Sequence, residues 1–129
     1  MKNLILSILF SLTFTLGFSQ SEKILLKSFI VLSNNIQFEL DCEKTISKWE
    51  KSYIKVELYV KSNVNQTILD RLSSVGRYDF ESKLVDGNQF IGVPKVKIDV
   101  KINDLQVKET FFMKIWIPET IGKVDDFSI

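Results

Sequence analysis

Histidine is absent from this 129-residue sequence, and only one cysteine, Cys42, is present. Without histidine, the chain lacks the commonest general base, the commonest metal ligand and every catalytic triad that contains an imidazole. A lone cysteine excludes a disulfide within the chain, so stability must come from the hydrophobic core. We therefore expect a protein that is not an enzyme, with no catalytic residues, no metal site and no cofactor.

An excess of charge of one sign is lacking as well. The chain carries 17 Lys and Arg side chains against 16 Asp and Glu side chains. Nucleic-acid-binding domains usually show a net basic surface, so this balance argues against nucleic acid as a partner. Carboxylates recur at every second position in two places, which is typical of the solvent-facing side of a strand: Glu39, Asp41 and Glu43, and Asp79 and Glu81. An enzyme that uses such carboxylates alone is the alternative.

Long hydrophobic runs are scarce, and the one that stands out lies at the start of the chain. Lys2 precedes an apolar run from Leu4 to Phe18, which ends at Ser19. The run is shorter than the roughly 20 residues that a membrane-spanning helix needs. We predict that residues 1–19 form a signal peptide that is removed, which leaves one domain over 20–129 with no stable membrane span. The protein would then be exported, to the periplasm or the cell surface; an uncleaved anchor is the alternative.

Alternation of apolar and polar residues dominates the rest of the chain and predicts β-strands. Asn-rich or Gly-containing segments at 33–35, 86–88 and 103–104 predict turns, and the first two predict hairpins. The expected strands are Ile24–Leu32, Ile36–Cys42, Tyr53–Lys61, 78–84, Gln89–Val93, 94–102 and Val107–Ile117. In the second of these strands, Cys42 shares a face with apolar residues, so we expect a buried thiol, with an intermolecular disulfide as the alternative.

One segment has helical rather than strand periodicity. Between an Asn-rich start and Gly76, apolar residues recur at spacings of three and four: Ile68, Leu69, Leu72 and Val75. This pattern predicts one α-helix over about 65–75, with Gly76 as its stop. The sequence therefore predicts a mainly β fold, an antiparallel sandwich or short β-roll with one α-helix.

Five aromatic residues fall on the otherwise polar faces of the predicted strands or at the entry to one of them: Trp49, Tyr53, Tyr59, Phe112 and Trp116. Aromatic side chains in such positions stack on sugar rings or on partner surfaces, so these five are the candidate contact residues. The alternative is that the helix or another layer covers the second face of the strands. In that case the five aromatic residues would belong to the core.

Two stretches resemble a known family. The segment Ser47–Glu57, with Trp49 before a strand, and the segment Phe112–Glu119, a strand that ends in Pro118, are similar to the head-GIN-like adhesin domains of bacterial envelope proteins. The resemblance implies a β domain without catalytic residues.

These observations favour an exported, noncatalytic envelope module that presents a β surface for contact with an envelope protein or a glycan. The alternative is a carrier of a small apolar ligand, or a secreted inhibitor, with a cavity between helix and sheet lined by residues such as Leu72, Phe80 and Phe111. Self-association through an exposed strand edge, at Ile24–Leu32 or in the tail after Pro118, is a further alternative.

Overall fold

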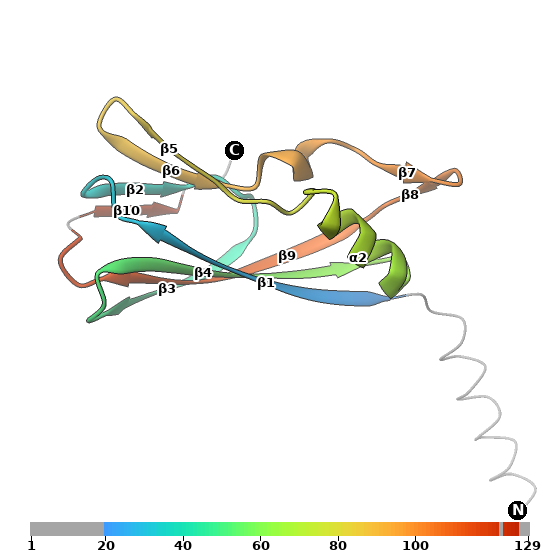
Figure 1. The fold of residues 1–129 in the computed structure, drawn as a ribbon, viewed down its shortest axis with the longest axis horizontal. Helices are drawn as coiled ribbons and strands as arrows, with labels where there is room; N and C mark the ends of the chain where they lie inside the picture. The colour runs from blue at the N-terminus through green and yellow to red at the C-terminus, as the bar shows by residue number, and fades with distance from the viewer. Residues whose placement is uncertain (1–19, 122, 127–129) are drawn as a thin grey trace, which may run out of the picture.

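A computed structural model describes residues 20–121 and 123–126, so the predicted signal peptide over 1–19 lies outside the described residues. In these described residues, two four-stranded sheets lie one above the other, with one α-helix, α2 (Gln66–Ser74), near one end (Figure 1). The predicted mainly β fold with one helix is therefore confirmed. Among the described residues, no helix is long and apolar enough to cross a membrane.

Sheet A has two ten-residue strands, β4 and β9, at its centre. Its order is β1-β4-β9-β3. Strand β4 runs antiparallel to both of its neighbours, whereas β3 runs parallel to β9. The four strands are β1 (Ser21–Ile30), β4 (Tyr53–Ser62), β9 (Glu109–Pro118) and β3 (Glu43–Trp49).

Sheet B faces sheet A and has the order β10-β2-β6-β5. Strand β2 runs parallel to both of its neighbours, so the two sheets are mixed rather than wholly antiparallel. The strands are β10 (Lys123–Asp126), β2 (Asn35–Phe38), β6 (Asn88–Gly92) and β5 (Glu81–Val85). A separate small hairpin joins β7 (Lys101–Ile102) to β8 (Leu105–Gln106).

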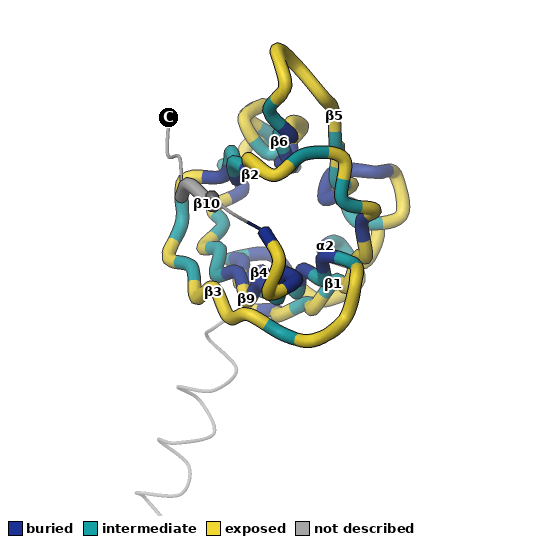
Figure 2. The backbone as a smooth tube through the Cα atoms, turned by 90° about the vertical axis from the view of Figure 1, so that its left-hand side faces the viewer, coloured by how far each residue is buried: buried dark blue, intermediate teal, exposed yellow. Residues whose placement is uncertain are grey.

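The core lies between the two sheets, and Figure 2 shows residues of both sheets that are buried, in dark blue. Strand β4 supplies one side of it, because its alternate residues Ile54, Val56, Leu58 and Val60 are fully buried. Helix α2 closes the core near β1 through Leu69, which is also fully buried. Alternation in β4 thus leaves its other residues on the opposite face of sheet A.

Local signals located α2 and the tight turns correctly. The Asn65 side chain accepts a hydrogen bond from the Ile68 amide at 2.9 Å and caps the helix, which ends before Gly76 at a φ of +93°. The turn at Asp86 and Gly87 joins β5 to β6 as an antiparallel hairpin, as predicted. Both residues have positive φ, the geometry that two-residue hairpin turns require.

Two of the predicted elements are wrong, and one strand was not predicted. The turn at 33–35 does not make a hairpin, because it carries the chain from sheet A into sheet B. The strand predicted over 94–102 begins instead as a 3-10 helix, Pro94–Lys97, and pairs only at Lys101–Ile102. Strand β3 (Glu43–Trp49) was not predicted, because its exposed residues show no apolar alternation.

Candidate functional site

The five aromatic residues singled out from the sequence lie on one surface, the face of sheet A that points away from the core. In β4 and β9 they alternate with fully buried residues, and the register places Tyr59 beside Phe112. Strand β3 adds Trp49 beside the end of β9. We call this surface the outer face; its aromatic residues are Trp49, Tyr53, Tyr59, Phe112 and Trp116.

Ring contacts join the aromatic residues across strands. Trp49 packs edge-on against Tyr53, with 5.0 Å between ring centroids, and tilted against Trp116 at 6.2 Å. Tyr59 contacts Phe112 at 5.8 Å. The Trp49 indole Nε1 donates a hydrogen bond to the Tyr53 carbonyl at 2.9 Å, which fixes the orientation of that ring. The outer face is therefore ordered by contacts within the protein itself.

Lysine side chains lie over these rings. The Lys55 Nζ is 5.0 Å from the Trp116 centroid, and the Lys114 Nζ is 5.4 Å from the Tyr59 centroid. The Lys51 Nζ is 5.5 Å from the Trp49 centroid. Ammonium groups over aromatic faces gain a cation–π attraction. The outer face thus combines aromatic surface with three ammonium groups, of which the one on Lys55 also forms an ion pair with Glu57 at 3.5 Å.

The face remains open in the described part of the chain. Helix α2 packs against the opposite side of sheet A, where its Leu69 enters the core. Each of the five aromatic residues is partly exposed. The structure therefore favours an exposed surface over the alternative in which the helix covers these rings. That they contact a partner stays a prediction.

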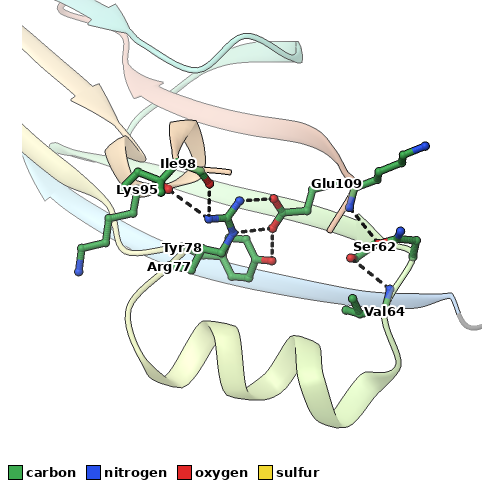
Figure 3. Close-up of polar contacts among 9 residues, drawn as sticks. Ser62, Val64, Arg77, Tyr78, Lys95, Ile98 and Glu109 are labelled. Carbon is green, nitrogen blue, oxygen red and sulfur yellow. Dashed lines mark hydrogen bonds and ion pairs between the residues drawn. The ribbon is translucent and has the colours of Figure 1, made fainter. Parts of the chain in front are cut away.

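A buried polar cluster that the sequence pattern does not predict lies at the start of β9 (Figure 3). The Arg77 guanidinium donates to both Glu109 oxygens, from Nη2 at 2.6 Å and from Nε at 3.0 Å. Its Nη1 donates to the carbonyls of Lys95 and Ile98, and the Tyr78 hydroxyl donates to Glu109. Both charged side chains are less than a tenth exposed. We call this cluster the arginine clamp.

The arginine clamp shifts the titration of its members. Burial, and then the hydrogen bond to Glu109, raise the pKa of Tyr78 well above its ordinary value of 10.0. The hydrogen bond to Glu109 also raises the pKa of Arg77. Every nitrogen of the guanidinium has a protein acceptor, so the clamp joins the segment that follows α2 to β9 and to the 3-10 helix.

The Tyr78 shift predicts an alkaline loss of stability. The folded state holds the phenol proton more tightly than the unfolded state, so the free energy of unfolding falls as pH rises above Tyr78's ordinary pKa of 10.0. We expect Tyr78→Phe to reduce this decline and to cost about 1 kcal/mol at neutral pH. Urea unfolding between about pH 8 and about pH 11 measures both effects.

Tyr59→Phe is the matched control, because the Tyr59 hydroxyl also donates to a carboxylate, Glu57, but from a partly exposed site. We expect its alkaline decline to equal that of the wild type. If the free energy of unfolding of Tyr78→Phe declined with pH as steeply as that of the wild type, the assignment of the alkaline loss to Tyr78 would be contradicted.

The remaining sequence candidates are distributed over other parts of the fold. Glu39 and Glu81 line one shallow pocket of about 110 Å³ together with Lys83 and Lys97. Asp79 lies in a different, open groove of about 310 Å³ beside β1. Cys42 is half-buried and packs against the core.

The residues proposed to line a carrier cavity are partly buried against the core. Phe80 contacts Phe29, with 5.7 Å between ring centroids, and Phe111 contacts Tyr78 at 6.3 Å. These side chains are therefore engaged in packing, which gives the carrier alternative no support.

Comparison with known proteins finds little similarity. No family model and no curated protein matches the chain. A solved structure described as a "putative cell adhesion protein" from Clostridium sporogenes ATCC 15579 shares 16% sequence identity with it, at a TM-score of 0.42. The match covers 79% of this chain and 46% of the other, so the chain spans about half the length of that protein. A similarity of this size establishes neither a common fold nor a common function, and the resemblance to head-GIN-like adhesin domains stays a prediction.

Proposed function

We propose that this protein is an exported, noncatalytic module of the cell envelope that binds an acidic polysaccharide on the outer face of sheet A. The observation that carries the proposal is the gathering of five partly exposed aromatic side chains, from three adjacent strands, on one open face. Rings anchored in this way form an ordered platform that loses little conformational entropy on binding.

The chemistry of the face favours a glycan over a protein. Sugar rings present apolar C–H faces that pack on aromatic rings, and Trp and Tyr supply large contact areas for this. Protein interfaces are enriched in aromatic residues but depleted in lysine. Here Lys51, Lys55 and Lys114 lie over the rings. Ammonium groups beside a stacking platform complement a sugar that carries a carboxylate or a sulfate.

Binding to polygalacturonate, a polymer of uronic acid, tests this proposal. We expect Trp116→Ala to weaken the binding about tenfold or more, which corresponds to about 1.4 kcal/mol. The double variant Lys55→Gln, Lys114→Gln should weaken it and reduce its dependence on salt concentration, because exposed charges are screened by salt. Isothermal calorimetry with polygalacturonate, and with neutral dextran for comparison, measures both effects.

The matched control is the double variant Lys83→Gln, Lys97→Gln, which removes two lysines that line the pocket on sheet B. We expect its affinity for polygalacturonate to equal that of the wild type. Equal weakening by the control pair, equal binding of dextran, or recovery of a protein partner whose binding needs Trp116 while polygalacturonate does not bind, would each overturn the assignment to an acidic glycan.

A further inference from the structure

Strand β1 lies at the edge of sheet A, and side chains bind its outward backbone groups at both ends but not in the middle. Alternate residues of an edge strand turn their N–H and C=O groups away from the neighbouring strand. In β1 these are the even-numbered residues, because the Gln66 Nε2 donates to the Glu22 carbonyl at 3.1 Å and the Gln89 Nε2 donates to the Ile30 carbonyl at 2.9 Å. Two glutamine side chains thus occupy the two ends of the edge.

Between the glutamines lie the three remaining even-numbered residues, Ile24, Leu26 and Ser28. Within residues 20–121, the structure gives no hydrogen-bond partner to the outward backbone groups of these three. Their side chains belong to the outer face, and Ile24 and Leu26 are 58% and 61% exposed. A long edge strand with exposed apolar side chains readily pairs with another strand.

We propose that a second copy of the chain pairs with this edge, antiparallel and centred on Leu26. The open segment is symmetric about Leu26, so this register places Leu26 opposite Leu26 and Ile24 opposite Ser28 of the second copy. Each opposed pair exchanges two backbone hydrogen bonds. All three open residues are then satisfied in both copies, and the glutamines at the ends limit the pairing to this segment.

Charge supports the same register. The odd-numbered residues of β1 point to the inner side, where an open groove of about 310 Å³ lies between Leu25–Lys27 and Tyr78–Phe80. With Leu26 at the centre, Lys27 of the second copy lies opposite Leu25, at the groove that the acidic residue Asp79 also lines. A register centred on Leu25 would instead place Lys23 opposite Lys27 of the second copy, and like charges in opposed positions are destabilising.

The pairing joins the two copies of sheet A into one continuous sheet. Opposed residues of antiparallel strands project to the same side, so both outer faces point in one direction. The dimer would thus present two aromatic platforms on one surface. Dimerisation is independent of what those platforms bind, so failure of either proposal leaves the other standing.

Sedimentation velocity of the protein as recovered from producing cells tests the dimer. We expect the mass of two chains for the wild type. Leu26→Lys brings two ammonium groups together at the symmetry axis and should raise the dissociation constant about tenfold or more. Leu84→Lys, at a 53% exposed position on the edge strand of sheet B, is the matched control and should remain a dimer. A monomeric wild type, or a dimer that Leu26→Lys leaves intact, would overturn the proposal.

Cysteine trapping tests the register. In a Cys42→Ser background, Leu26→Cys should give a disulfide-linked dimer, because opposed residues of an antiparallel pair have Cα atoms about 4.5 to 5.5 Å apart, within disulfide range. Ile24→Cys should not, because the two copies of residue 24 lie four positions out of register, about 13 Å along the strand. Trapping at position 24 in place of position 26, or at neither, would refute this register.

Discussion

Arg77→Met is expected to destabilise the fold by about 3 to 5 kcal/mol, because it leaves the buried Glu109 carboxylate without its cation. Both side chains of this pair are less than a tenth exposed, and the bidentate contact is joined by the Tyr78 hydroxyl. The substitution also removes the Arg77 donor from the Ile98 carbonyl and leaves the Lys95 carbonyl with only the Ile98 amide as a donor. Urea denaturation followed by Trp fluorescence measures the loss.

Arg71→Met is the control for this variant, since Arg71 is the other arginine of the chain and is exposed on α2. We expect it to change stability by less than about 0.5 kcal/mol. Adding Glu109→Leu to Arg77→Met removes the unpaired charge and should restore part of the loss. A double variant less stable than Arg77→Met alone would contradict the electrostatic explanation.

The second large effect is expected at α2. Leu69→Ala should destabilise the protein by about 2 to 5 kcal/mol, because Leu69 is the fully buried residue of the helix and its removal leaves a cavity against sheet A. Thermal unfolding monitored by circular dichroism measures this change. The helix itself adds little stability in isolation at nine residues, so its docking depends on this contact.

Val75→Ala is the matched control for Leu69→Ala. The sequence pattern assigned both residues to one apolar stripe, but Val75 follows the last helical turn and is 69% exposed. We therefore expect a change within about 0.5 kcal/mol. Similar losses at both positions would contradict the assignment of the effect to the burial of Leu69, because Ala is the best helix former and neither substitution lowers helix propensity.

Local pattern was enough to place β4, α2 and two of the turns, because each depends on neighbours within a few residues. It failed over 94–102, where alternation is as regular as in β4. There, Pro94 fixes the backbone φ at the start of the 3-10 helix, and the Arg77 guanidinium donates hydrogen bonds to the carbonyls of Lys95 and Ile98. A contact from 20 residues away thus overrides the strand preference of the segment.

The parallel pairing of β3 with β9 could not be predicted from the sequence either, because it too depends on distant residues. Strand β3 pairs with β9 across more than 60 residues of chain, and as an edge strand it buries little of either face. Its sequence therefore lacks the apolar alternation from which strands are predicted.

The candidate site was easier to find than the arginine clamp. Aromatic residues on a polar strand face break the alternation and stand out, and the structure places all five on one surface. The sequence offers one signal for the arginine clamp. Arg77 is one of only two arginines in a chain whose other basic residues are all lysines. A guanidinium forms the bidentate contact with a carboxylate that an ammonium cannot. Glu109 itself carries no local signature of a buried partner.

The position of β9 between β3 and β4 affects when the protein can fold. A ribosome makes β3 and β4 some 50 residues before β9, and neither can join the other until β9 arrives to lie between them. Distant pairings of this kind form slowly and late. The nascent chain can pair β1 with β4 early, but it has no completed sheet A until its last quarter emerges.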